Sequence, residues 1–468
     1  MRCFILNMGN EFWHSAKRKA QSAQTKTSGI IRMFLSDFFP ILKTIRFVQR
    51  AKRLARSARK EEPGGKPLVS SLTLRAMRYT LCAMPYALRA TRYALSATLL
   101  VLYACSSDDP APTPEPYQPT PYEIEIPYGF PTLLNIPDDN PMKVEGIKLG
   151  RTLFYDGRLS GRTHPDSLMS CSTCHLQEYS FECGTDHPEF VNGFTHGITG
   201  KPTPHVMLPL INLVWNSNGY LWNGFVAPDN PAMIYGNLED LVWMGVTAEH
   251  EMNSDTTRVK ELFQNIPGYP EMFEKAFGTK TVTMDRISKA IAQFVRTFIS
   301  SNSKFDKYMR GEVQLSPEEL RGFVLFTTEE GADCFHCHGG FGNPLFTTNK
   351  FYNNGKDSVF KDPRDRYAIT GDPMDKGAYK ATTLRNIELT GPYMHDGRFA
   401  TLEEVIEFYS HDLVNSPQID PLMHHIANGG IQLTPSEKTD LMAFIKTLRD
   451  DEFLTNPDFG PPDQLPGK

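Results

Sequence analysis

The chain contains the five-residue pattern Cys-x-x-Cys-His twice, and this repetition constrains it more than any other feature. The copies lie at residues 171–175 and 334–338 of a 468-residue chain that has only 8 Cys and 13 His. The pattern is typical of covalent haem c attachment, in which each thiol bonds to a vinyl group and the histidine binds the iron. The sequence therefore predicts two covalently bound haems c. The predicted attachment residues are Cys171, Cys174, Cys334 and Cys337, and the predicted proximal iron ligands are His175 and His338.

Other uses of paired cysteines fit less well. Zinc and iron–sulfur frameworks usually place their cysteine pairs near one another, whereas a long stretch of chain separates these two pairs. A thioredoxin-type redox pair would not need the histidine that follows each second cysteine.

Basic and acidic residues are distributed unevenly along the chain. The first 104 residues carry 19 Lys and Arg against 4 Asp and Glu, and the rest carries 30 against 50, for a net charge of −5. The acidic part would repel nucleic acid, so we expect no nucleic-acid partner. It could instead attract a small basic electron-donor protein, such as a monohaem cytochrome c or a cupredoxin.

The basic N-terminal part does not resemble a folded domain. Residues 77–97 are three similar seven-residue copies, which suggests a simple repeat in the gene. We interpret residues 1–76 as a gene-start artefact or a disordered extension. A coiled coil is the alternative, but three copies are short and Pro85 interrupts one of them.

Residues 77–104 resemble a lipoprotein signal peptide. Arginines precede an apolar run that ends in Leu-Tyr-Ala immediately before Cys105, and the run is too short to span a bilayer. We predict lipidation of Cys105, export, and tethering to a membrane in the periplasm or cell envelope. An uncleaved anchor and an ordinary signal peptide are the alternatives. The proline-rich residues 105–127 are predicted to form an extended tether.

The remaining sequence predicts a mainly α fold. Apolar residues recur at helical spacing after Thr283, and Ser316 and Thr434 each begin a capping box with proline at the first helical position. An internal echo is also present: Gly-x-x-Leu-Phe precedes both haem motifs, at residues 150–154 and 322–326. We predict two cytochrome c-like domains, residues 128–305 and 306–460, each wrapping one covalent haem.

This sequence resembles the bacterial dihaem cytochrome c peroxidase family, including its MauG-like branch. Besides the haem motifs, the matching segments are residues 150–160, 287–311, 382–387 and, most specifically, 389–398. The resemblance implies that the N-terminal haem is the peroxidatic site and that the C-terminal haem stores and relays an electron. Reduction of hydrogen peroxide to water takes two electrons, which two redox centres can supply.

The resemblance also implies a distal ligand for the second haem. In the peroxidases a methionine follows the histidine of the Pro-Tyr-x-His motif by fourteen residues, and the MauG-like branch has tyrosine there. In this chain that position, counted from His395, is Tyr409. An anionic oxygen ligand would lower the haem potential relative to Met/His ligation. Met394, Met423 or no ligand are the alternatives.

Further roles follow at the first haem. Glu251 matches the family's distal glutamate, which would move a proton between the oxygens of peroxide. His196 lies near the removable distal histidine of classical members, with His187 and His205 as competitors. Trp222 matches the tryptophan between the haems, either as an electron bridge or as ordinary core packing. The family's distal glutamine falls near Leu241, which is a departure.

Calcium is a further cofactor of the family. Thr390 and Pro392 match the carbonyl positions that bind it, but the expected asparagine falls at Val206. Family members are often homodimers, although no interface signal is present here.

Three functions remain compatible with the sequence. The first is a dihaem peroxidase that reduces hydrogen peroxide in the cell envelope. The second is a MauG-like oxidase acting on a protein or organic substrate, which Tyr409 favours. The third is a non-catalytic dihaem electron carrier, which Leu241 favours and Glu251 argues against.

Overall fold

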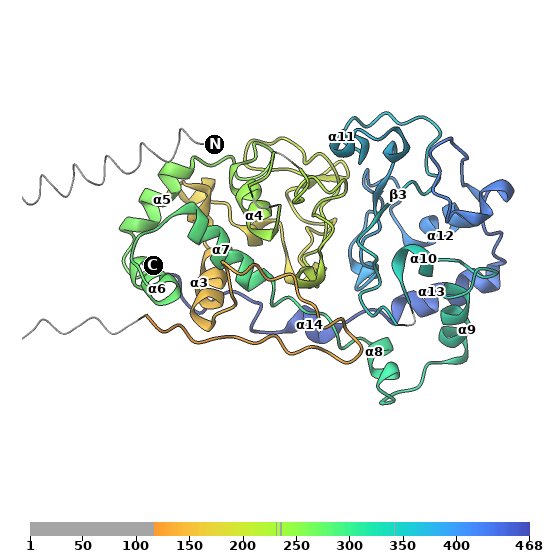
Figure 1. The fold of residues 1–468 in the computed structure, drawn as a ribbon, viewed down its shortest axis with the longest axis horizontal. Helices are drawn as coiled ribbons and strands as arrows, with labels where there is room; N and C mark the ends of the chain where they lie inside the picture. Colours follow the sequence, from red (N-terminus) through yellow and green to blue (C-terminus); the bar gives the residue numbers. More distant parts are fainter. Residues whose placement is uncertain (1–116, 231, 235, 341) are drawn as a thin grey trace, which may run out of the picture. The chain divides into compact units, whose positions relative to one another are not determined.

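The computed structural model describes residues 117–230, 232–234, 236–340 and 342–468. This part is mainly helical, as predicted, and its only β-structure within these ranges is two short antiparallel strand pairs and isolated bridges (Figure 1). No described helix is long and apolar enough to cross a membrane. The predictions for residues 1–76, 77–104 and Cys105 lie outside the described residues.

The helices are α3 (Val144–Phe154), α4 (Leu238–Thr247), α5 (Thr256–Asn265), α6 (Tyr269–Phe277), α7 (Met284–Val295), α8 (Lys304–Met309), α9 (Pro317–Phe326), α10 (Phe335–His338), α11 (Tyr367–Thr370), α12 (Leu402–His411), α13 (Pro435–Lys446) and α14 (Asp451–Thr455); the strands are β1 (Phe190–Val191), β2 (Phe194–Thr195), β3 (Phe351–Tyr352) and β4 (Tyr379–Lys380).

Helix starts agree with the capping signals in the sequence. Thr283 accepts a hydrogen bond from the backbone of Arg286 at the start of α7, and the predicted apolar face of that helix is buried. Ser316 and Thr434 form the expected capping boxes at α9 and α13. These local predictions are confirmed. They could be made from the sequence because a capping side chain accepts hydrogen bonds from backbone N–H groups of the adjacent helical turn, whatever the tertiary contacts are.

The glycines of the internal echo let pairs of helices approach closely. In the first half, a side chain at Gly150 of α3 would lie 2.0 Å from the carbonyl oxygen of Ala290 in α7. In the second half, a side chain at Gly322 of α9 would lie 1.9 Å from the carbonyl oxygen of Asp440 in α13. The same device therefore packs one helix pair in each half, and each pair forms part of a separate hydrophobic cluster.

A second repeat is a tight turn in each half. Tyr220 pairs with Val226 in an antiparallel bridge, and Tyr393 pairs with Phe399 in the same way. The residue after each tyrosine has a positive φ: 67° at Leu221 and 71° at Met394. Such values are costly for residues other than glycine, so the surrounding contacts hold both turns in one shape.

The C-terminal tail returns to the first half. Phe453 of α14 and Phe459 belong to the hydrophobic cluster of α3 and α7, although we placed residues 306–460 in the second domain. Arg151 of α3 donates to the carbonyl of Gly460 at 2.8 Å. Figure 1 shows the tail running from α13 past α14 toward α6. A tail that fills a distant core is invisible to local sequence patterns.

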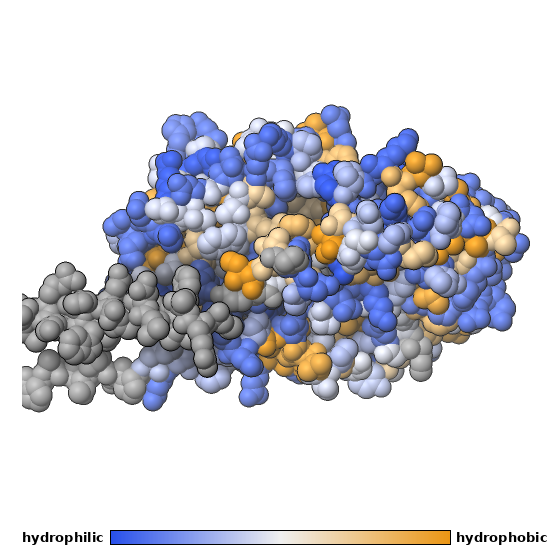
Figure 2. Space-filling model, turned by 45° about the horizontal axis from the view of Figure 1, so that its top comes forward, coloured by the Kyte–Doolittle hydropathy of each residue, from blue (hydrophilic) through white to orange (hydrophobic). Residues whose placement is uncertain are grey.

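The large apolar side chains gather mostly in these clusters. The visible face in Figure 2 is largely hydrophilic, with scattered hydrophobic groups. Exposed apolar residues such as Leu133 and Ile234 are few relative to the buried ones.

Candidate haem sites

Each Cys-x-x-Cys-His motif lines its own cavity. Cys171, Cys174 and His175 border the first cavity, which α4 and the segment 203–213 also line. The motif at residues 334–338 borders the second, between α12, α13 and the segment 379–395. Because the cysteine pairs line different cavities, they cannot form one four-cysteine metal centre.

The two motif histidines are held in the same way. Nδ1 of His175 lies 2.6 Å from the carbonyl oxygen of Phe181, and Nδ1 of His338 lies 3.0 Å from that of Thr382. A proton on Nδ1 that is donated to a carbonyl leaves Nε2 as the free ligand atom. Burial lowers the pKa of each histidine to about 4, so both rings are neutral, as a metal ligand must be.

Glu251 lines the first cavity from the turn that follows α4. Its backbone N–H donates to Ala248 at 3.0 Å, and its carbonyl accepts from Ile198 at 2.9 Å. Burial raises the pKa of this carboxyl to about 7, which is suited to gaining and losing a proton near neutral pH. His250 lies beside it, with Nε2 3.9 Å from Oε1 of Glu251.

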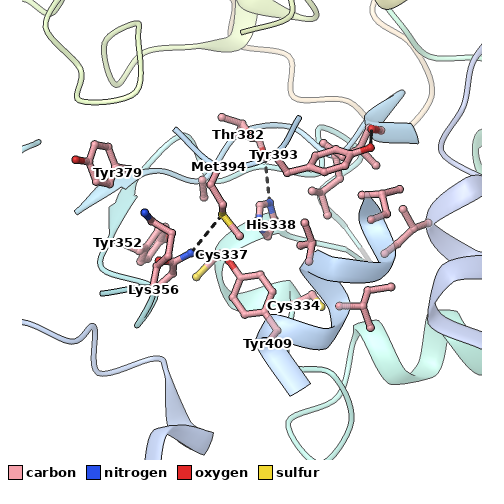
Figure 3. Close-up of a pocket in the computed structure, with 18 of the residues that line it drawn as sticks. Cys334, Cys337, His338, Tyr352, Lys356, Tyr379, Thr382, Tyr393, Met394 and Tyr409 are labelled. Atoms are coloured by element: carbon pink, nitrogen blue, oxygen red, sulfur yellow. Dashed lines mark hydrogen bonds between the residues drawn. The ribbon is translucent and has the colours of Figure 1, made fainter. Parts of the chain in front are cut away.

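Tyr409 lines the second cavity from α12. Figure 3 shows its hydroxyl and the sulfur of Met394 turned toward the space in front of His338. Asn354, from the loop after β3, donates to the Tyr409 oxygen at 2.9 Å and lies 3.7 Å from the Met394 sulfur. Burial raises the pKa of Tyr409, while the hydrogen bond from Asn354 favours the phenolate. Both Tyr409 and Met394 therefore remain within the cavity as candidate ligands, and Met423 also borders it.

Comparison of the two halves distinguishes the cavities. Tyr409 is the eighth residue of α12, which begins after the cap residue Thr401. The eighth residue of α4, counted from its cap residue Asn237, is Gly245. A side chain at Gly245 would lie 3.0 Å from Oε2 of Glu251. The first cavity thus has a carboxyl where the second has a phenol.

Trp222 borders both cavities. Its indole N–H donates to the carbonyl of Val206 at 2.8 Å, and its own carbonyl accepts from Lys380 at 2.7 Å. Its ring lies 6.3 Å from that of His395, edge to face. Trp222 thus borders the cavities of both haem motifs, and its role as an electron bridge stays a prediction.

Lys380 also borders both cavities and was not singled out from the sequence. It is 7% exposed, and its Nζ donates to the carbonyl of Asn349 at 2.9 Å. No carboxylate of the described residues forms an ion pair with it, and burial lowers its pKa to about 7. A buried amine in this position fits a cofactor that carries its own carboxylates, as haem does with its propionates.

The candidate distal histidines differ in the contacts that their ring nitrogens make. His196 lines the first cavity, with Nδ1 3.0 Å from the carbonyl of Phe194 and Nε2 available. His205 also lines it, but its Nε2 is 2.6 Å from Oδ2 of Asp362. His187 does not border this cavity, and Leu241 borders it with an apolar side chain. The pairing of His205 with Asp362 spans distant segments and could not be read from the sequence.

Comparison with known proteins agrees with this geometry. A family model described as "Di-haem cytochrome c peroxidase" matches residues 144–314. The chain is 31% identical to the methylamine utilization protein MauG of Methylophilus methylotrophus, over 68% of this chain and 86% of the relative. The chain belongs to the di-haem cytochrome c peroxidase family. It is also 32% identical to cytochrome c551 peroxidase of Nitrosomonas europaea, over 68% of this chain and 83% of the relative.

A solved structure of a similar protein supports the same family membership. The crystal structure of a MauG-like protein associated with microbial copper homeostasis matches with a TM-score of 0.63 and 33% identity. The match covers 73% of this chain and 100% of that one. Membership in this family makes the chain an oxidoreductase that carries two haems c. The paired motifs, the restrained histidines and the buried Lys380, which forms no ion pair with a carboxylate of the described residues, fit that cofactor.

Proposed function

We propose that this protein reduces hydrogen peroxide to water in the periplasm or cell envelope, using electrons from a small donor protein. The proposal includes two cytochrome c-like domains, with the first haem as the peroxidatic site and the second as the electron store. Its main support is the contrast between Gly245 and Tyr409 at the same position of α4 and α12. A glycine leaves room for peroxide beside Glu251, whereas a tyrosine can occupy the distal side.

The chain's own residues would bind, orient and protonate the substrate. The haem, when bound, supplies the redox-active iron. Cys171 and Cys174 would hold the first haem, and His175 would bind its iron through Nε2. Glu251 would accept a proton from one peroxide oxygen and return it to the other, which a carboxyl with a pKa of about 7 can do near neutral pH. Leu241 offers no second proton-transfer group, so Glu251 would act without a neighbouring glutamine.

The second site would deliver the electrons. Cys334, Cys337 and His338 would hold the second haem, with Tyr409 as the distal ligand stabilised by Asn354. Trp222, which borders both cavities, would carry electrons between the haems. His196 would act as a removable ligand of the first haem, through its available Nε2.

Tyr409 also favours a second candidate function. A phenolate ligand stabilises ferric iron and lowers the potential of the second haem, which suits an oxidase of the MauG-like branch acting on a protein or organic substrate. The relatives named MauG support this alternative. The distinction depends on whether peroxide is consumed with a donor protein or drives oxidation of another substrate.

The test is peroxide turnover by haem-loaded protein beginning at Cys105, with the haem spectrum recorded in the half-reduced state. We expect rapid peroxide consumption and a high-spin first haem. Glu251→Gln should lower turnover by about 10²–10⁴-fold, because it removes the proton-transfer group. Glu249→Gln is the matched control, since Glu249 is 60% exposed and pairs with Lys201 outside the cavity.

Three outcomes separate the candidates. Turnover that Glu251→Gln abolishes and Glu249→Gln preserves supports the peroxidase. Peroxide-dependent oxidation of an added organic substrate, without a donor protein, favours the oxidase. Two low-spin haems and no turnover would leave only an electron carrier.

Several finer predictions belong to the same proposal. Lipidation of Cys105 would hold the protein at a membrane, and calcium would bind near Thr390 and Pro392. A homodimer is also expected from the resemblance. Mass spectrometry, calcium binding and sedimentation measurements would test them in turn.

A further inference from the structure

A cluster of histidine and carboxylate side chains lies beside the second haem motif, at the edge of the second cavity, which Asp333 and His424 border. His336 is the second of the two residues between Cys334 and Cys337. One ligand atom from each of His336, His424 and Glu329 lies within 4.8 Å of the others. Among the described residues, this is the one group of three such side chains that could hold a metal ion.

Asp333 orients both histidines. Its Oδ1 lies 2.6 Å from Nδ1 of His336, and its Oδ2 lies 3.2 Å from Nδ1 of His424. The Asp333 side chain is only 6% exposed, so these contacts hold it in place beneath the cluster. The hydrogen bond to Nδ1 of His336 fixes that ring and leaves its Nε2 as the ligand atom, which is the usual support of a metal-binding histidine. At His424, Asp333 lies at ion-pair distance.

Glu329 completes the set. Its Oε1 lies 3.6 Å from Nε2 of His336, which matches the separation of about 3.3–3.6 Å between ligands with bonds of about 2.0–2.2 Å in a tetrahedral site. Its backbone carbonyl accepts from Nε2 of His425 at 2.9 Å, which ties the loop of Glu329 to the 3₁₀ turn of His424. The side chains of Glu329 and His424 are 61% and 40% exposed, so small rotations can close the site.

We propose that His336, His424 and Glu329 bind a divalent transition-metal ion, with Asp333 as the positioning residue. Two imidazoles and one carboxylate suit Zn²⁺, Cu²⁺ and their neighbours, and do not suit the all-oxygen preference of Ca²⁺ or Mg²⁺. Exposure of the cluster leaves a fourth position for water. The ion would lie next to the residues that attach the second haem, since His336 adjoins Cys337.

The test is zinc binding by the haem-loaded protein, measured as bound zinc per two iron atoms by elemental analysis after equilibrium dialysis against a range of Zn²⁺ concentrations. We expect one Zn²⁺ per chain in the wild type. His424→Ala and Glu329→Gln should each weaken binding by at least about tenfold, and Asp333→Asn by about 10–100-fold. His336 is left unchanged because it lies inside the attachment motif.

His164→Ala is the matched control. His164 is 74% exposed and lies 3.6 Å from Asp166, a histidine–carboxylate pair without a third ligand, so this variant should bind zinc as the wild type does. The haem absorption spectrum would show that each variant is folded. The proposal is overturned if the wild type binds no zinc, or if His424→Ala and Glu329→Gln bind it as tightly as His164→Ala.

Discussion

Replacing Arg385 with methionine should destabilise the protein through loss of one buried ion pair. The Arg385 side chain has 0% exposure, and that of Asp306 has 7%. The guanidinium donates to the two carboxylate oxygens at 2.8 and 2.7 Å, and Nε donates to the carbonyl of Pro344 at 2.7 Å. Methionine keeps an apolar stem but leaves the carboxylate of Asp306 buried without its counterion.

The expected loss is about 3–5 kcal/mol in the free energy of unfolding, the usual result of removing one partner of a buried pair. Arg321 provides a matched control. It also contacts Asp440 through two hydrogen bonds, from Nε at 2.7 Å and from Nη2 at 2.8 Å, but its side chain is 54% exposed. The carboxylate of Asp440 is 7% exposed, as is that of Asp306, but the Arg321 guanidinium is half in water. Arg321→Met should therefore cost less than Arg385→Met, about 1–2 kcal/mol.

The substitution should also disturb the second haem site. The backbone N–H of Arg385 donates to the side chain of Thr383 at 3.2 Å, and the neighbouring Thr382 carbonyl holds Nδ1 of His338. A shift of this segment would change the orientation of the proximal histidine. We therefore expect an altered spectrum of the second haem in Arg385→Met and an unchanged one in Arg321→Met.

Urea unfolding of haem-loaded protein, monitored by circular dichroism, measures the free energy of unfolding that Arg385→Met loses. Burial acts to raise the pKa of Asp306, but the bonds from Arg385 and Ser303 together outweigh it, and the pKa lies below the usual value. The stabilisation is thus present above the unfolded pKa of about 3.9 and is lost as the pH falls through the lower folded value. The difference between wild type and Arg385→Met should be full at pH 7 and shrink in acid. Equal losses in both arginine variants at pH 7 would refute the reasoning.

Three further substitutions test the haem sites. In the wild type, peroxide turnover should rise with pH around pH 7, because the Glu251 carboxyl accepts a proton only when ionised. Glu251→Gln should abolish this rise, and a rise that persists would mean that another group causes it. Tyr409→Met should raise the reduction potential of the second haem in spectroelectrochemistry, since a thioether stabilises ferric iron less than a phenolate does; an unchanged potential would mean that Tyr409 is not the ligand. Trp222→Phe should slow electron transfer between the haems in stopped-flow traces while leaving both spectra unchanged, and equal rates would exclude Trp222 from the path.

The sequence by itself determined the parts that depend on neighbouring residues. The haem motifs could be recognised because two thioether bonds and one iron bond must close on the same macrocycle within five residues. The capping boxes at Ser316 and Thr434 predicted helix starts correctly, since the caps act within one turn. Tyr409 and Glu251 were identified through the family resemblance, and both border the expected cavities.

Only the tertiary structure decided which distant groups meet. Lys380 belongs to no motif in the sequence, yet it is buried and borders both cavities. Asn354 reaches Tyr409 across 55 residues, and the tail residue Phe459 fills the core of the first half. These contacts depend on how helices pack, and packing is set by the whole chain and not by the spacing of neighbouring residues.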